Sequence, residues 1–253
     1  MRGRLATTLR IIVVGTALAL GAGAPAGAQP PLLTDMSVHR ISITSSFTGT
    51  ELLLFGTVEE AGDIIVVARG PEPPVVVRKK ERVAGIWVNG EAVTFDRVPG
   101  YYAVAASRDI REIASPLLLS RLEIGAENLR FEPRGDIGEE AAAEYKKAVI
   151  RERLRKRLYS EEVGNVRFLG KRLFHTRLKF PAVVPVGPYT VHVYLVRDQE
   201  VVAAQSSPLF VNKSGMERAI YDFAHAQPFL YGVTAIALAL VAGWLASVIF
   251  RKA

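Results

Sequence analysis

The chain has 253 residues, of which 49% are hydrophobic and 23% are charged, so it can form a sizeable core and is not a disordered polymer. The net charge of +7 suggests a nucleic-acid partner, but five of the cations flank the two apolar ends of the chain: Arg2, Arg4, Arg10, Arg251 and Lys252. Removing these five leaves +2 for everything between them, so we expect no nucleic-acid partner. The chain has no cysteine, which excludes disulfides, thiolate metal sites and cysteine nucleophiles.

Residues 1–28 have the three parts of a secretory signal peptide. The first ten residues are basic, and the apolar run from Ile11 to Leu20 is too short to span a bilayer. The segment ends on the small-x-small pattern Ala26-Gly27-Ala28, which predicts cleavage between Ala28 and Gln29. An uncleaved N-terminal anchor is the alternative, and the short apolar run argues against it.

Residues 29–137 are expected to form a first β-rich unit. Short apolar or β-branched runs alternate there with Gly, Pro and polar breaks, which is typical of strands. The pair Asn89-Gly90 lies between two such runs and predicts the turn of a β-hairpin, because both turn positions require positive φ. The pattern is ambiguous from 109 to 134, where Asp109–Ile113 and Pro116–Leu122 are candidates for helical turns.

Residues 138–162 are predicted to form a charged amphipathic helix. Acidic residues occupy its first turns and basic residues its later half, in the order that the helix dipole favours. Ala143, Ile150, Leu154 and Leu158 fall on one narrow apolar face. We interpret the basic half, residues 146–157, as a solvated face; docking on anionic lipid or on an acidic partner is the alternative.

Residues 163–213 are expected to form a second β-rich unit. The segment Tyr189–Val196 alternates cleanly, with Tyr189, Val191, Val193 and Leu195 on one face. The expected fold class is therefore mainly β: a β-sandwich-like domain, with two Ig-like units as one arrangement, one inserted amphipathic helix and a single C-terminal transmembrane helix.

The C-terminal segment predicts a membrane anchor. Residues 214–227 form an amphipathic helix that lies either on the membrane surface or against its own domain. Residues 228–250 contain no charge over 23 positions, about 34 Å of helix, which is enough to cross a bilayer. Arg251 and Lys252, in the tail 251–253, are expected to hold the C-terminus in the cytoplasm. The predicted location is the bacterial inner membrane, single-pass, with the bulk of the chain in the periplasm.

Small residues recur every four positions within the predicted span, at Ala235, Ala239, Gly243 and Ser247. They form a stripe that allows another helix to approach closely. Chance is the alternative, since the segment is rich in Ala and Gly. If the stripe is used, it points to a membrane protein with several helices as partner.

No catalytic, cofactor-binding or metal-binding residues can be identified from the sequence. None of the four histidines, His39, His175, His192 and His225, has metal-ligand spacing, although His175 and His192 could meet across strands. Residues 164–172 have the wrong spacing for a phosphate loop and lack its Ser or Thr. We therefore expect no enzyme.

Five segments resemble a known family: Glu81–Asn89, Pro99–Ser107, Leu173–Phe174, Val186–Tyr189 and the tail from Pro228 to Ser247. Together they look like the transmembrane protein family of alphaproteobacteria, over nearly all of the mature chain. The resemblance implies no catalytic residues, and it implies a membrane transporter, a sulfite-exporter-like permease, as partner.

The leading functional hypothesis is a non-catalytic accessory or interaction protein, tethered to a membrane partner by its span. The alternative is a periplasmic module that binds a small ligand or a folding client, which is an argument from fold analogy alone. An enzyme ranks third.

Overall fold

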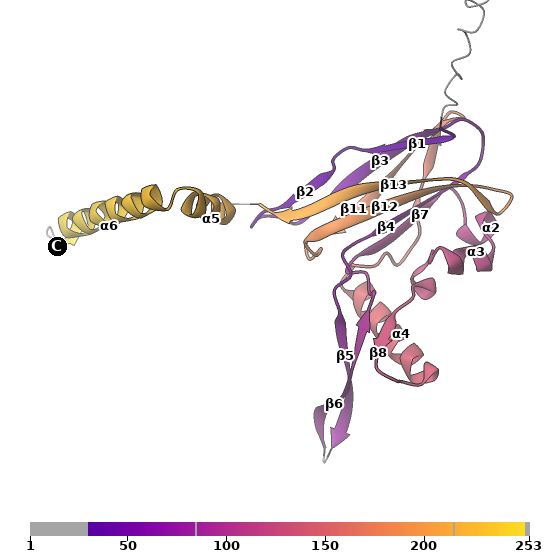
Figure 1. Cartoon of the computed structure of the whole chain (residues 1–253), viewed down its shortest axis with the longest axis horizontal. Coiled ribbons are helices and arrows are strands. Elements are labelled where there is room, and N and C mark those ends of the chain that lie inside the picture. Colours follow the sequence, from indigo (N-terminus) through magenta and orange to yellow (C-terminus); the bar gives the residue numbers. More distant parts are fainter. Residues whose placement is uncertain (1–29, 84, 215, 251–253) are drawn as a thin grey trace, which may run out of the picture. The chain divides into compact units, whose positions relative to one another are not determined.

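The computed structural model describes residues 30–83, 85–214 and 216–250. The predicted cleavage site, Ala28 and Gln29, and the predicted topology anchors, Arg251 and Lys252, lie outside these residues. Within them the chain is mainly β, as expected, with three sheets, a set of helices on one of them and a long apolar helix at the C-terminal end (Figure 1).

The first sheet has four antiparallel strands in the order β1-β3-β11-β10. At Gly56, near the C-terminal end of β3, an added Cβ would lie 2.5 Å from the Leu33 carbonyl oxygen and 2.7 Å from the Phe174 ring. Only glycine fits this close approach. The strands are β1 (Leu32–Met36), β3 (Gly49–Val58), β11 (Leu173–Pro181) and β10 (Arg167–Leu169).

The second sheet has six strands in the order β2-β13-β12-β4-β7-β9. The first and last pairs, β2 with β13 and β7 with β9, are parallel, and the other pairs are antiparallel. The strands are β2 (Arg40–Ile43), β13 (Glu200–Lys213), β12 (Gly187–Arg197), β4 (Asp63–Arg69), β7 (Tyr102–Ala106) and β9 (Gly164–Asn165).

Strands from the two predicted β-rich units share both sheets. In the first sheet β11 pairs with β3, and in the second sheet β12 pairs with β4. The ranges 29–137 and 163–213 therefore build one mainly β domain, in place of two Ig-like units. Hydrophobic alternation indicates where a strand lies but not which distant strand it pairs with, so the sequence could not reveal this interleaving.

The main core lies between these two sheets. The inward face of β12, with Tyr189, Val191, Val193 and Leu195, is fully buried in it, as the alternation predicted. Strand β4 is buried on both faces: Ile64 and Val66 join the main core, whereas Ile65 and Val67 join a second core. A strand covered on both sides reads as a continuous apolar run, which explains the sequence of β4.

Helices cover the outer face of β4 and β7 and form the second core. The two candidate helical turns between 109 and 122, where the sequence pattern was ambiguous, are helical in the structure: α2 (Ile110–Ile113) and α3 (Pro116–Arg121). Asp109 caps α2, and Ser115 caps α3, whose first residue is Pro116. A short 3-10 helix, η1 (Ala126–Asn128), and α4 (Glu139–Arg155) complete the layer.

Helix α4 ends earlier than the predicted range 138–162. Arg157 adopts a φ of +56°, which terminates the helix. The chain then pairs with β7, because Tyr102 N–H donates to the Leu158 carbonyl and Ser160 N–H donates to the Tyr102 carbonyl. Leu158 thus lies beyond the helix and is buried.

The third sheet is a long hairpin, β5 (Val75–Val83) and β6 (Ile86–Asp96), with β8 (Glu132–Arg134) at its base. The predicted turn at Asn89-Gly90 is wrong: the turn lies between Val83 and Ile86, and Asn89 and Gly90 belong to β6. The observed register pairs β5 with β6 along nearly its whole length, with an irregularity at Lys79, and buries Val93 and Phe95 against Val149 of α4.

Two helices follow β13, α5 (Met216–Ala226) and α6 (Pro228–Phe250). In α5 the side chains of Ile220, Tyr221 and Phe223 are exposed. Residues Pro228–Val248 of α6 are long and apolar enough to cross a membrane, and none of this stretch is buried against the rest of the described chain.

Candidate functional site

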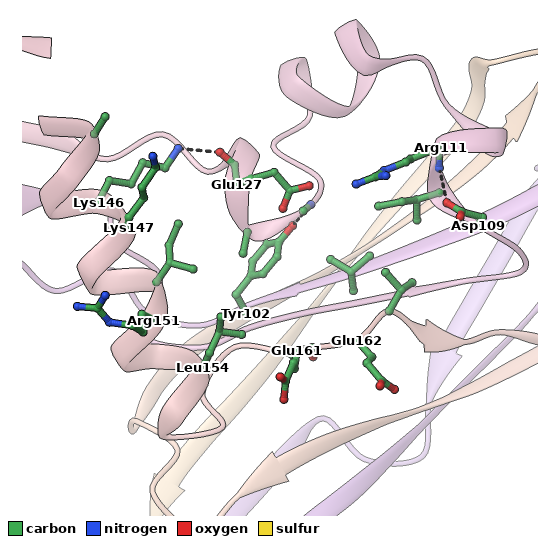
Figure 2. Close-up of a pocket in the computed structure, with 18 residues that line it drawn as sticks. Tyr102, Asp109, Arg111, Glu127, Lys146, Lys147, Arg151, Leu154, Glu161 and Glu162 are labelled. Atoms are coloured by element: carbon green, nitrogen blue, oxygen red, sulfur yellow. Dashed lines mark hydrogen bonds between the residues drawn. The ribbon is translucent and has the colours of Figure 1, made fainter. Parts of the chain in front are cut away.

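A cavity of about 780 Å³ lies on the helical side of the domain, and we call it the α4 pocket (Figure 2). Its walls come from α4, from the loop and 3-10 helix at 125–127, from the start of α2 and from residues 160–163; β7 forms its floor. Segments that are far apart in the sequence therefore build one concavity in the β domain.

The interior of the α4 pocket is apolar. Tyr102 and Val104 contribute from β7, and Ile150 and Leu154 contribute from α4. Ile150 and Leu154 belong to the apolar face that the sequence predicted for this helix, and both are only half-buried. The same face therefore leaves accessible apolar surface in a concave site, which is the usual setting for binding.

The rim of the α4 pocket carries opposite charges on different walls. Lys147 and Arg151 come from α4, and Glu161 and Glu162 come from the segment after it (Figure 2). Within residues 30–83, 85–214 and 216–250 none of these four side chains forms an ion pair. They are therefore available to an occupant.

Tyr102 fixes the loop that walls the pocket. Its hydroxyl donates to the Glu123 carbonyl at 2.8 Å and accepts from the Gly125 N–H at 2.9 Å. Its ring packs edge-on against Tyr159, whose hydroxyl donates to the Pro99 carbonyl at 2.8 Å. Burial raises the pKa of both phenols, so they stay protonated and act as structural donors.

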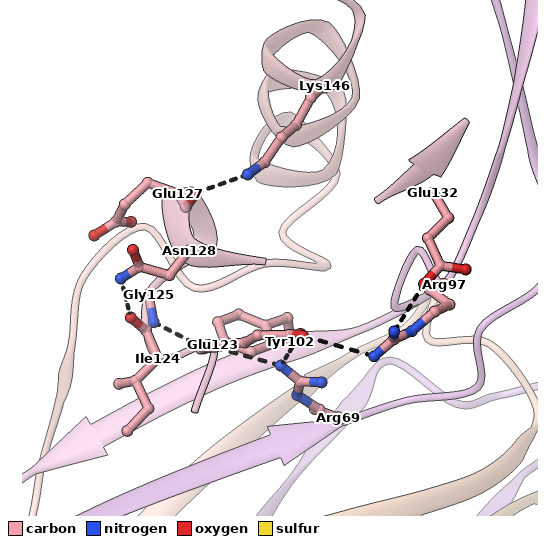
Figure 3. A network of polar contacts seen from close by, with 10 residues as sticks. All are labelled: Arg69, Arg97, Tyr102, Glu123, Ile124, Gly125, Glu127, Asn128, Glu132 and Lys146. Carbon is pink, nitrogen blue, oxygen red and sulfur yellow. Dashed lines mark hydrogen bonds and ion pairs between the residues drawn. The ribbon is translucent and has the colours of Figure 1, made fainter. Parts of the chain in front are cut away.

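An ion-pair network holds the same loop from the other side (Figure 3). The Arg69 guanidinium lies 2.7 Å from the Glu123 carboxylate, and both side chains are mostly buried. Arg97 contacts Glu123 at 3.6 Å and Glu132 at 2.8 Å in a more exposed position. Because Glu123 has a φ of +54°, these contacts hold a backbone conformation that a glutamate rarely adopts.

Lys146 joins α4 to the pocket wall. Its ammonium donates to the Glu127 carbonyl at 2.7 Å and lies 5.8 Å from the centre of the Phe131 ring. Desolvation lowers the pKa of Lys146, but its ammonium group is held in structural contacts with the Glu127 carbonyl and the Phe131 ring. The groups at the pocket with a shifted pKa are thus tied to the backbone, and the arrangement is suited to binding.

The histidines are not brought together. His175 lies in the four-stranded sheet and His192 in the six-stranded sheet, where its ring nitrogen is 2.7 Å from the Ser206 hydroxyl. Burial lowers the pKa of His192. Among the described residues no group of three or more His, Asp or Glu side chains is placed to hold a metal ion.

The predicted helix-packing stripe lies on α6, where Ala235, Ala239, Gly243 and Ser247 are all exposed. An added Cβ at Gly243 would meet no atom within 4 Å. Use of the stripe by another helix stays a prediction. The sequence missed the α4 pocket, and its only signal was the narrow apolar face of α4, which looked like an ordinary core face.

The family comparison bears on the whole length of this structure. The family model described as "Putative transmembrane protein (Alph_Pro_TM)" matches residues 31–252, which include the β domain, the α4 pocket and α6. No curated protein and no solved structure matches the chain. The match covers most of the chain and agrees with the apolar length of α6. The chain therefore belongs to this family of transmembrane proteins, and α6 is its membrane anchor.

Proposed function

We propose that this protein is a non-catalytic accessory protein of the bacterial inner membrane, which holds a partner through the α4 pocket. The observation that carries the proposal is the pocket itself: an accessible apolar interior with unpaired charges of both signs at its rim. A surface of this kind matches a protein segment that carries apolar side chains flanked by charges in the opposite order.

The distribution of charge favours a polypeptide over a simple anion. An anion would be attracted by Lys147 and Arg151 but repelled by Glu161 and Glu162 on the opposite wall. A segment of a partner can place a carboxylate near α4 and a cation near residues 160–163 while its apolar side chain contacts Leu154. Both ends of the occupant are then stabilised.

A small ligand or folding client is the second candidate. The cavity of about 780 Å³ lies in the range that encloses drug-sized molecules. Under this alternative a zwitterionic compound with an apolar body would fit the same two walls. Stabilisation of the purified full chain by a compound, in the absence of any protein partner, would favour the small-ligand alternative.

The membrane anchor and the predicted signal peptide together support the proposed location. A signal peptide at 1–28 would export the β domain to the periplasm, and α6 would end in the cytoplasm at Arg251 and Lys252. The stripe at Ala235, Ala239, Gly243 and Ser247 suits a partner with several helices, such as a transporter-like permease. Two contacts, one in the membrane and one at the α4 pocket, would then hold the same partner.

The pocket can be tested with two matched substitutions. Ala143 and Ala141 are both exposed on α4, but only Ala143 lines the α4 pocket. We expect Ala143→Arg to fill the pocket and to reduce recovery of the partner at least tenfold when the full chain is isolated from native membranes in mild detergent. Ala141→Arg should leave recovery unchanged. Recovery of the wild-type chain without any stoichiometric protein would contradict the proposal.

The orientation can be tested with reporter fusions. Alkaline phosphatase is active only after export, so a fusion made just before Pro228 should be active. A fusion after Ala253 should be inactive, with the reverse pattern for a reporter that works only in the cytoplasm. An inactive phosphatase just before Pro228 would overturn the proposed location of the β domain.

A further inference from the structure

The far end of the β5–β6 hairpin exposes a cluster of large apolar side chains, and we call it the hairpin tip: Val83, Ile86, Trp87 and Val88. Ile86 is 68% exposed and Trp87 is 65% exposed. The base of the same hairpin is buried against α4, with Phe95 only 1% exposed. The hairpin therefore changes from a packed base to an apolar end that contacts no core.

Cations lie along β5, the strand that leads to the hairpin tip. Arg78, Lys80 and Arg82 are exposed, and within the described residues none of them forms an ion pair. Lys79 is held by Glu144 of α4 at 3.4 Å. Only two carboxylates, Glu81 and Glu91, lie in this part of the hairpin, so its net charge is positive.

We propose that the hairpin tip inserts into the surface of an anionic lipid bilayer, as a second membrane contact besides α6. Tryptophan prefers the interface between headgroups and acyl chains, where its ring is both apolar and hydrogen-bonding. Lysine and arginine next to such side chains bind anionic headgroups. In the hairpin tip, Trp87 and Ile86 are the side chains that enter the interface, and Lys80 and Arg82 are the cations that bind the headgroups.

The anchor makes lipid the favoured occupant. Each copy of the chain carries α6, so a bilayer surface is tethered to the β domain at a high effective concentration. A protein partner or a second copy could instead bind the open edges of the two-stranded hairpin. Neither of these would require anionic lipid, and this difference separates lipid from the other two occupants.

The position of Trp87 can be read from its fluorescence. The chain contains two tryptophans, and the other, Trp244, lies in α6. The full chain carrying Trp244→Phe therefore reports on Trp87 alone. It is reconstituted into vesicles of phosphatidylcholine with or without 30% phosphatidylglycerol, and quenching is compared between dibrominated lipid and aqueous acrylamide.

We expect Trp87 to be quenched by brominated lipid in anionic vesicles and by acrylamide in neutral ones, with the anionic signal weakened by salt. Lys80→Gln with Arg82→Gln should lower the ratio of inserted to free tip about 25-fold, taking about fivefold for each cation near an anionic surface. The matched control is Lys171→Gln with Arg172→Gln, two exposed cations in another turn, which should have no effect.

Three results would overturn the proposal. Full acrylamide quenching of Trp87 in anionic vesicles would show that the tip stays in water. An equal effect of the Lys171 and Arg172 pair would reduce the contact to general attraction between domain and surface. Protection of Trp87 that grows with the ratio of protein to lipid would show that a second copy covers the tip. Circular dichroism of each variant establishes that the β domain is folded.

Discussion

Removal of the Tyr102 hydroxyl is predicted to destabilise the β domain more than the same change at Tyr159. The two side chains form a matched pair, because both are 2% exposed and their rings contact each other. They differ in what their hydroxyls bind. Tyr102 satisfies two backbone groups, at Glu123 and Gly125, and Tyr159 satisfies only the Pro99 carbonyl.

The expected loss of stability follows from the backbone groups that each substitution leaves without a hydrogen-bond partner. A buried polar group without a partner costs about 1–3 kcal/mol. In Tyr102→Phe the Gly125 N–H loses its acceptor, whereas the Glu123 carbonyl keeps a long contact of 3.4 Å with Arg69. We therefore expect Tyr102→Phe to lower the free energy of unfolding by about 2–3 kcal/mol, and Tyr159→Phe to lower it by about 1–2 kcal/mol.

The assay is urea denaturation of the full chain in mild detergent, monitored by near-ultraviolet circular dichroism. Hydrogen exchange at the Gly125 amide provides a local measurement, and Tyr102→Phe should accelerate it at least tenfold while Tyr159→Phe leaves it unchanged. If Tyr159→Phe proved as destabilising as Tyr102→Phe, or if the Gly125 amide kept its protection, the reasoning that Tyr102 holds the pocket wall would be refuted.

Three further outcomes are expected from the same denaturation assay. Gly56→Ala should cost about 2–3 kcal/mol because its Cβ would overlap the Leu33 carbonyl. Gly138→Ala meets no atom but replaces the N-cap of α4, so it should cost at most about 1 kcal/mol; equal effects would contradict this. Burial raises the pKa of four phenols, those of Tyr101, Tyr102, Tyr159 and Tyr189. Because the same phenols ionise more easily in the unfolded chain, stability should be intact below pH 10 and should fall as the pH rises beyond it. A constant stability up to pH 12 would contradict the burial of these phenols. Burial opposes ionisation of Asp63, but hydrogen bonds from Arg108 and Ser107 outweigh it and lower the pKa of this carboxyl group. Asp63→Asn should therefore lower the free energy of unfolding by about 1 kcal/mol near neutral pH, and by progressively less as the pH falls below 4. A loss of stability that does not shrink in acid would be the contrary result.

Local patterns in the sequence predicted the elements well. The alternation in β12 and the apolar length of α6 both follow from neighbouring residues, and both are present, whereas the pattern between 109 and 134 was ambiguous and proved partly helical. Pairing between distant strands has no such local signal, which is why the ranges before and after α4 looked like separate units. The Asn89-Gly90 signal was local and strong, and the longer register of β5 and β6 outweighed it.

The α4 pocket could not be predicted for a related reason. Its apolar residues on α4 look like core residues in the sequence, and its floor is Tyr102, which lies 48 positions before Ile150. Only the fold shows that the apolar face of α4 is half-buried and borders a concavity beside β7. The hairpin tip was obscured in the opposite way, since Trp87 was assigned to a strand beside a turn that does not form.

The connection from β13 to the anchor determines how the domain carries mechanical load. Any tension transmitted from the bilayer enters the fold at Lys213, the last residue of β13, and the component of this load that lies along β13 acts on the axis of the strand. Eleven residue pairs join β13 to β12, and four more join its last residues to β2. Because hydrogen bonds between strands run across this axis, the load shears many of them together and does not open them one at a time. The domain should therefore resist pulling at its C-terminal end.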